Sequence, residues 1–449
     1  MENTKKVSFG GKFGYSCGAA ACGFSMIMPT LISYYATQSL LIPIALVSTV
    51  IALVKILDGV TDIVIGAIMD RTKSKLGKAR PWYLWGTIPY GIFMALTFWI
   101  PSSLPTGGKI ALLAIFYALT ISVFGTMLQV ARYALISRMT DNPKQQNILS
   151  VLGDGIAALA VGVLISLAPN WAAQIGWNIT FTIFGVIAII LGVICFALVR
   201  EDETIMEVTK EKVPVKELFK AIFHNKFALF IIIAVFINQL ATGMIQLGGL
   251  YYFTYVVGNM GLYSIVMLLS LIAGVVGMFV GGFLMKATSK AFGISALCTT
   301  VCLLIVYFFG LNSPVILAIF LDLALMFGMT TCGTCYGAMS AQAVDYGEWK
   351  TGVRSEGLTS APVNVGQKIG AAIGAAVIGA VMAAGGFIEG APTQTAEAVS
   401  AIKNGYLLVP AIIFLIAGIF FMIFWNYDKL KGQITADLAE SRAAKIAAK

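Results

Sequence analysis

The sequence predicts an all-α membrane protein that crosses the bilayer many times, and two observations lead to that prediction. Of the 449 residues, 59% are hydrophobic and only 11% are charged, whereas about 25% of the residues of a soluble protein are charged. Apolar stretches longer than about 18 residues, the length that spans a bilayer, recur along the whole chain. This composition excludes a cytosolic enzyme, a secreted disulfide-rich scaffold and a disordered chain.

Twelve apolar stretches are long enough to be transmembrane helices, six on each side of a polar segment. They lie at 13–35, 40–69, 81–100, 110–137, 148–168, 176–199, 227–257, 261–285, 291–311, 314–341, 358–386 and 405–426. We expect an N-terminal half at 1–199, a central cytoplasmic loop at 200–226, a C-terminal half at 227–426 and a cytoplasmic tail at 427–449. Apolar residues at helical spacing within 215–223 favour a short amphipathic helix on the membrane surface, with a disordered tether as the alternative.

Lysine and arginine set the expected orientation, because positive residues concentrate in cytoplasmic segments. With the N-terminus inside, the outer segments contain only Lys109 and Lys403, and nearly all other basic residues lie in inner segments. We therefore expect a multi-pass protein of the cell (inner) membrane with both termini in the cytoplasm. We also expect a monomer. The basic residues lie between apolar spans, so the lipid bilayer is the expected partner and nucleic acid is not.

Cysteine and histidine give no sign of catalysis or of a structural metal. The seven cysteines all lie in predicted spans, and the single histidine, His224, lies in the central loop. Cys332 and Cys335 have CxxC spacing without a second ligand pair, so helix packing is favoured over a metal site. We expect no enzyme, no disulfide framework and no cofactor other than a coupling ion.

A weak internal repeat relates the two halves. Four positions near the end of the second span recur 216 residues later, near the end of the eighth: Gly66, Met69, Thr72 and Gly77 match Gly282, Met285, Thr288 and Gly293. Parallel halves of six spans are typical of the major facilitator fold, whose binding site lies between the halves near the middle of the membrane.

The second span contains the densest group of membrane charges: Lys55, Asp58 and Asp62, with Thr61 between the acids. A charge at bilayer depth costs at least about 2.5–3.5 kcal/mol, so such residues are functional candidates. Asp58 and Asp62 are one helical turn apart, and two close carboxylates both stay ionised only with a cation between them. We predict a Na⁺ or H⁺ site, with a fixed Lys55–Asp58 pair as the structural alternative.

The fourth span places Thr126, Gln129, Arg132 and Tyr133 at spacings of three and four. Arg132 has a guanidinium suited to carboxylate, sulfate or phosphate, and Tyr133 has a ring suited to stacking on a sugar. We predict that Gln129, Arg132 and Tyr133 bind substrate. The alternative is that Arg132 extends to the inner membrane interface.

Three further charges lie within spans. Lys368 follows Gly366 in a glycine-rich eleventh span that lets another helix approach closely, so it is a predicted substrate-binding residue. Asp154 and Asp322 are weaker candidates whose alternative role is to pair helices.

The chain is similar to the glycoside–pentoside–hexuronide:cation symporters, the melibiose permease family, over essentially its whole length. The resemblance rests on DGVTD at 58–62, GAIMDRT at 66–72, GKARPW at 77–82, YYFTYVVG at 251–258, DYGEWKTGVRSEG at 345–357 and QKIG at 367–370. It implies cation ligands at Asp58, Asp62, Thr61 and Thr126, and a lysine at Lys368 that links the cation and sugar sites. It also implies an inner gate formed by Asp70, Arg71, Arg80, Asp345, Glu348, Arg354 and Glu356.

Several departures from the family pattern concern the substrate. Galactoside-transporting relatives have an acid early in the first helix, where 17–23 has none, and a second sugar-binding acid where Gln129 stands. Their arginine between the fourth and fifth helices is also missing, with Asp154 nearby. Because Arg132 and Lys368 remain, the sequence favours a negatively charged solute.

These observations predict a secondary symporter that couples inward Na⁺ or H⁺ movement to uptake of a glycoside-like solute, of hexuronide or glucuronide type. The alternatives are a uniporter or exchanger of a non-sugar organic anion or amphipathic solute, and a lipid-handling membrane protein of the same fold.

Overall fold

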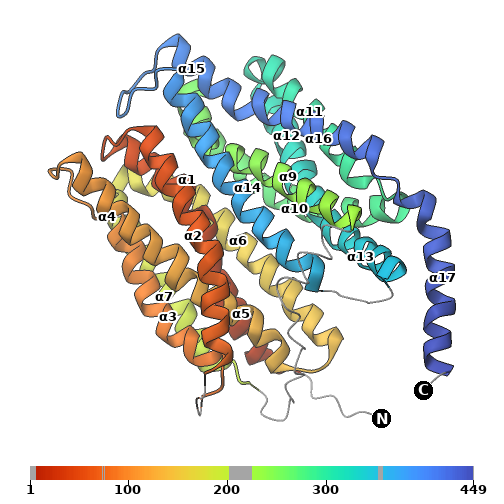
Figure 1. Ribbon diagram of the computed structural model, residues 1–449. Helices are drawn as coiled ribbons and strands as arrows, with labels where there is room; N and C mark the ends of the chain where they lie inside the picture. Colours follow the sequence, from red (N-terminus) through yellow and green to blue (C-terminus); the bar gives the residue numbers. More distant parts are fainter. Residues whose placement is uncertain (1–6, 73, 75, 202–224, 352–356, 448–449) are drawn as a thin grey trace. The chain divides into compact units, whose positions relative to one another are not determined.

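The computed structural model describes residues 7–72, 74, 76–201, 225–351 and 357–447, and within these ranges it contains helices and no β-strand (Figure 1). The predicted amphipathic helix at 215–223 lies outside the described residues. The all-α prediction is therefore confirmed for the described part of the chain.

The helices of the first part of the chain match the first six predicted apolar stretches. They are α1 (Phe9–Gln38), α2 (Ile44–Asp70), α3 (Arg80–Thr97), α4 (Thr106–Ala118), the π-helical segment η1 (Leu119–Gly125), α5 (Thr126–Met139), α6 (Pro143–Ile175) and α7 (Trp177–Leu198). The segments α4, η1 and α5 are continuous and form the fourth span.

The later part of the chain contains more π-helical segments. Its elements are α9 (Lys226–Tyr251), η2 (Tyr252–Val257), α10 (Met260–Ala287), α11 (Ala291–Phe309), the 3₁₀ turn η3 (Gly310–Asn312), α12 (Pro314–Leu325), η4 (Met326–Thr331), α13 (Cys332–Thr351), α14 (Gly357–Ala384), α15 (Ala396–Lys403), η5 (Asn404–Leu408), α16 (Val409–Phe424) and α17 (Tyr427–Ala447). The helix α17 is the C-terminal helix in Figure 1.

Eleven helices of the described residues are long and apolar enough to cross a membrane. The predicted span at 81–100 corresponds to α3, which is not among the eleven. Its 18 residues include Arg80, Pro81 and Pro89, which make it the least apolar of the expected spans. The prediction of twelve membrane helices is thus supported for eleven of them.

Two compact units make up the chain. The first unit contains Met1–Thr209, Gly249–Leu271 and Gly379–Val399, and the second contains Lys210–Gly248, Ile272–Ile378 and Ser400–Lys449. The helices α9, α10 and α14 each contribute to both units. The predicted halves at 1–199 and 227–426 stay a prediction.

In the first unit, small residues let helix backbones pack closely. The helix α1 packs along α6 and α7, and α3 packs along α7. At the α3–α7 crossing, Gly91 and Gly185 face each other: a Cβ atom on Gly91 would lie 2.5 Å from the carbonyl oxygen of Gly185. Such close contact replaces the hydrophobic driving force that is absent between helices in lipid.

In the second unit, aromatic side chains join the tail helix to the membrane helices. Trp425 and Tyr427 belong to a buried cluster with Phe227, and Trp349 of α13 donates a hydrogen bond of 2.7 Å to Asp437 of α17. Cys332 and Cys335 lie fully buried in the same cluster. Their burial among aliphatic and aromatic side chains makes these two thiols part of the helix packing of the second unit.

We predict that Gly91→Val destabilises the first unit. The new side chain would overlap backbone atoms of α7, and overpacking of this kind costs about 1–3 kcal/mol. Thermal unfolding of the purified protein in detergent measures the effect as a lower Tm. The matched control is Gly107→Val, because a Cβ atom at Gly107 has no neighbour within 4 Å. Equal Tm values for the two variants would contradict the proposed packing constraint.

Candidate functional site

The predicted cation ligands lie together in the first unit, around the middle of α2. Asp58 and Asp62 are partly buried and lie one turn apart on this helix. Thr126 Oγ1 donates a hydrogen bond of 2.8 Å to Asp58 Oδ1. The Thr61 hydroxyl donates to the carbonyl oxygens of Leu57 and Asp58, at 3.2 and 3.1 Å. The site therefore presents oxygen atoms from two carboxylates and two hydroxyls, which are the ligand type that a hard cation prefers.

The position of Thr126 depends on the π-helical segment η1, which precedes it directly. A π-helix bonds residues five apart and leaves the local hydrogen-bonding pattern altered. Here Thr126 Oγ1 also approaches the carbonyl oxygen of Ile121, at 3.3 Å, and Ser122 Oγ donates to the carbonyl oxygen of Val54 in α2, at 2.9 Å. These two hydroxyls fix the fourth span against the helix that carries Asp58.

The predicted substrate residues of the fourth span do not all share one environment. Arg132 is 1% exposed, Gln129 is partly buried and Tyr133 is 49% exposed. Arg132 and Tyr133 are consecutive on α5, so their side chains point about 100° apart around the helix. The ring of Tyr133 still contacts the guanidinium, whose Cζ atom lies 5.0 Å from the ring centre.

Arg132 forms an ion pair with Asp154, which corrects the expectation that its charge is unpaired. Arg132 Nη2 bonds Asp154 Oδ1, joining α5 to α6. The guanidinium also lies 5.9 Å from the ring centre of Tyr15, and Gly153 leaves the space in which Tyr15 and Arg132 meet. Asp154 thus pairs helices, as its alternative interpretation held, and it balances the positive charge at this place.

The ion pair is asymmetric in its exposure. The side chain of Asp154 is 49% exposed whereas that of Arg132 is 1% exposed. Arg132 Nε has no hydrogen-bond partner among the described residues. The guanidinium is therefore enclosed by unit 1, and the choice between a substrate site and the inner membrane interface stays a prediction.

Lys368 lies on α14 in the second unit and is partly buried. As expected for a glycine-rich span, α14 packs closely on another helix: a Cβ atom on Gly370 would lie 2.6 Å from the carbonyl oxygen of Phe236 in α9. Gly374 contacts Leu240 of α9 in the same way. The assignment of Lys368 to substrate binding stays a prediction.

The structure describes five of the seven predicted inner-gate residues, which lie on or next to different helices. Asp70 is the last residue of α2, Arg71 is exposed, and Asp345 and Glu348 lie on α13, where Glu348 is 7% exposed. Arg354 and Glu356 lie outside the described residues.

Arg80, a predicted inner-gate residue, binds a backbone carbonyl oxygen near the end of α7. Its guanidinium donates two hydrogen bonds, of 3.1 and 2.9 Å, to the carbonyl oxygen of Phe196 near the end of α7, and lies over the Phe196 ring. This arrangement satisfies a helix C-terminal carbonyl, where a positive charge is also favoured by the helix dipole.

Glu201 is a structural residue that the sequence analysis missed. Its carboxylate accepts hydrogen bonds from the backbone amides of Lys78, Ala79 and Arg80 at the start of α3, at 3.0, 2.8 and 2.8 Å. Arg138 Nη1 lies 3.9 Å from the same carboxylate. In the sequence Glu201 begins a polar linker and precedes no helix start, so no local capping pattern indicates this role.

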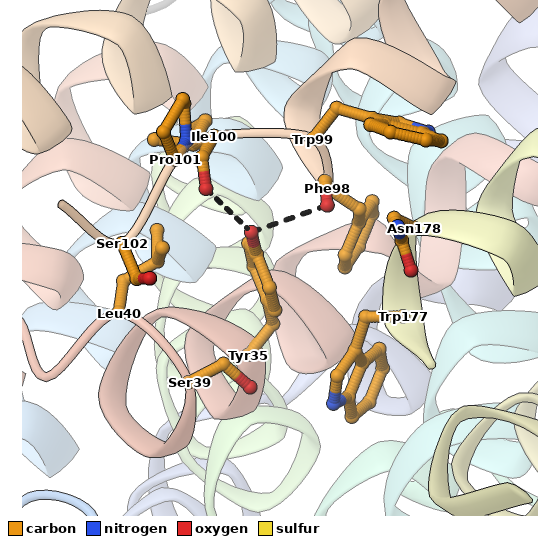
Figure 2. A pocket seen from close by; sticks show the side chains of 10 residues that line it. All are labelled: Tyr35, Ser39, Leu40, Phe98, Trp99, Ile100, Pro101, Ser102, Trp177 and Asn178. Atoms are coloured by element: carbon orange, nitrogen blue, oxygen red, sulfur yellow. Dashed lines mark hydrogen bonds between the residues drawn. The ribbon is translucent and has the colours of Figure 1, made fainter. Parts of the chain in front are cut away.

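A separate pocket of about 490 Å³ lies in the first unit, where the ends of α1, α3 and α7 meet (Figure 2). Figure 2 shows the Tyr35 hydroxyl between the carbonyl oxygens of Phe98 and Ile100, to which it donates at 3.2 and 3.4 Å. The ring of Trp177 stacks on that of Phe98 with the centres 5.8 Å apart. None of the predicted site residues lines this pocket.

The helical architecture and the buried polar groups define a membrane transporter of the major facilitator fold. A family model described as MFS/sugar transport protein matches residues 14–429, so the chain belongs to this family. Its members are transporters, not enzymes, and the sequence-based assignment to the glycoside–pentoside–hexuronide:cation symporters is confirmed.

Two of the similar curated proteins are named as carriers of a sugar or a glucuronide. The isoprimeverose transporter of Lactiplantibacillus pentosus is 27% identical over 97% of this chain and 92% of its own length. The glucuronide carrier protein homolog of Escherichia coli is 27% identical over 95% and 94%. Among solved structures, a D-xylose–proton symporter superposes with a TM-score of 0.68 at 10% identity, covering 93% of this chain and 97% of its own, which supports the fold.

We predict that Asp154→Ala strongly destabilises the first unit, because it leaves Arg132 as a buried charge without its partner. Removing one member of a buried ion pair costs about 3–5 kcal/mol. The charge exchange Arg132→Asp with Asp154→Arg is expected to recover part of that loss. Thermal unfolding measures both, and Asp141→Ala, at an exposed position, is the control. A wild-type Tm for Asp154→Ala would contradict the pairing.

Proposed function

We propose that this protein is a secondary symporter in which a cation bound by Asp58, Asp62, Thr61 and Thr126 drives accumulation of a glycoside-like solute. The observation that carries the proposal is the hydrogen bond from Thr126 to Asp58, with Asp62 one turn away on α2. It brings hydroxyl and carboxylate oxygens from two spans together at bilayer depth, where a carboxylate pair is costly unless a cation neutralises it.

Symport requires that cation and solute each bind better when the other is present. Gln129 lies one turn beyond Thr126 on α5, and Arg132 and Tyr133 follow one turn later. A solute bound by these side chains would therefore contact the same helix that carries a cation ligand. We propose that α5 transmits the coupling, that Lys368 contributes from the second unit, and that both termini are cytoplasmic.

The charge of the proposed solute follows from the pairing of Arg132. The expectation of a hexuronide or glucuronide depended on an unpaired positive charge, and Asp154 balances that charge. The proposed class therefore includes neutral glycosides as well as uronides. The names of the relatives support both, since one transports isoprimeverose and another is a homolog of a glucuronide carrier.

We predict that Asp58→Asn and Asp62→Asn each abolish cation-driven accumulation while downhill flux of solute survives. Uptake of labelled isoprimeverose and of a methyl glucuronide into vesicles, with and without a Na⁺ or pH gradient, measures both properties. It also identifies the cation and the preferred solute charge. Asp141→Asn, at an exposed position, is the matched control. If either membrane variant concentrates solute as well as the control, the cation site is wrongly assigned.

We predict that Thr126→Val raises the cation concentration needed for half-maximal uptake. The substitution keeps the shape of the side chain and removes the donor to Asp58, and a hydrogen bond to a charged group is worth about 1.5–3 kcal/mol, or roughly 10- to 100-fold. Thr120→Val is the control, since the Thr120 hydroxyl donates only to the carbonyl oxygen of Phe116 in its own helix. An equal shift in both variants would argue against a specific role for Thr126.

A further inference from the structure

Asp322 is a buried acid in the second unit that the cation site does not use. It lies on α12, four residues before the π-helical segment η4. The residue is 8% exposed, and its Oδ1 atom has no hydrogen-bond partner among the described residues. No described basic side chain forms a salt bridge with it, in contrast to Asp154, which is half exposed and paired with Arg132.

The described helices of the second unit offer Asp322 almost no opposite charge within the membrane. The helix α11, which packs along α12, has no charged residue between Ala291 and Phe309, and the same holds for α16. The titratable groups of α11 are the thiols of Cys298 and Cys302 and the phenol of Tyr307. The remaining charges of the membrane helices of this unit lie near helix ends, or on α14 in one case: Lys226, Lys286, Asp345, Glu348, Lys350, Lys403 and Lys368. Lys403, at the end of α15, lies over the Tyr307 ring of α11 with its Nζ atom 4.4 Å from the ring centre.

The helix α9 contacts η4 through a polar side chain, and that side chain is neutral. Asn238, 2% exposed, donates a hydrogen bond of 2.5 Å to the carbonyl oxygen of Gly328 in η4. One turn further along α9, the hydroxyl of Thr242 is buried and has no partner among the described residues. Neutral groups stabilise a buried carboxylate anion far less than a cation would.

We propose that Asp322 is a proton-binding site in the second unit, separate from the carboxylate pair of α2. A carboxylate removed from water without a counter-charge takes up a proton instead of remaining ionised, because desolvating the anion costs far more than desolvating the neutral acid. The carboxyl group then holds the proton on one oxygen while it is buried, and releases it to water when the site becomes hydrated. No bond other than the O–H bond forms or breaks.

A metal ion fits this place less well than a proton. Na⁺ and divalent ions need several oxygen ligands, including enough negative charge to replace their water. Asp322 belongs to no group of three or more acid, cysteine or histidine side chains that could hold a metal ion among the described residues. A single buried carboxyl group is sufficient to bind a proton, and the π-helical segment η4, of a kind that is frequent at functional sites, begins four residues after Asp322.

Infrared spectroscopy of the full-length protein in liposomes tests the proposal without a transported solute. A protonated carboxylic acid has a carbonyl stretch that an ionised carboxylate lacks, so the wild-type protein is expected to show this band at neutral pH. The band is expected to lose the contribution of one acid in Asp322→Asn, to keep it in Asp322→Glu, and to be unchanged in the exposed control Asp141→Asn. A wild-type band in Asp322→Asn would overturn the proposal.

Thermal unfolding as a function of pH gives a second readout. If the folded state holds the proton, Asp322 does not oppose folding at acidic pH, where it is protonated in the folded and in the unfolded protein, and its own contribution lowers the stability as the pH rises. Asp322→Asn is neutral at every pH, so its Tm is expected to match wild type in acid and to exceed it in alkali. Parallel pH profiles of the two proteins would show that Asp322 is only a packing residue. Neither readout depends on the Asp58 site, so failure here leaves the proposed symport untouched.

Discussion

A bilayer core contains no water that can hydrogen-bond to the chain, so each polar group within it must find a partner inside the protein. This constraint accounts for the continuous helices and for most buried polar contacts. The Ser122 hydroxyl bonds a backbone carbonyl oxygen of α2, the Asn238 amide bonds one in η4, and Arg132 is held by Asp154. Among the acids that the structure describes, Asp322 stands out, because its buried Oδ1 atom lacks such a contact.

A π-helical segment occurs at a similar place in both halves of the sequence. The fourth and tenth spans each contain a π-helical segment, η1 and η4, about midway along their length. In η1, Ser122 donates to Val54 of α2, and in η4, Thr331 donates to Gly277 of α10, at 3.1 Å. The two contacts are alike in kind, but their residues do not keep the 216-residue offset of the repeat at the ends of the second and eighth spans. The chemistry of the halves differs, because α2 contains three acids, Asp58, Asp62 and Asp70, whereas α10 contains none.

The sequence was sufficient for features that depend on local pattern. Long apolar stretches predicted the helices, and the four-residue spacing of Asp58 and Asp62 placed both acids on one side of α2. Contacts between distant segments were not predictable in this way. Hydropathy does not show that Asp154 of α6 pairs with Arg132 of α5. The charge of Arg132 was therefore expected to be unpaired, whereas Asp154 balances it in the structure. The π-helical turn before Thr126 is likewise invisible, because the sequence of η1 is compatible with ordinary α-helix. The contact of Thr126 with the acids was implied only by family resemblance.

The carboxylate of Glu201 has a consequence for how the chain is made. It binds three amides at the start of α3, more than 120 residues earlier in the sequence. During synthesis, α3 leaves the ribosome long before Glu201 does, so this helix spends the interval with its first amides solvated or bound elsewhere. Domains generally begin folding from the N-terminal end as they emerge. The cap then forms only after the sixth span, α7, has been inserted, so the Glu201 contact forms late in the assembly of the first six spans.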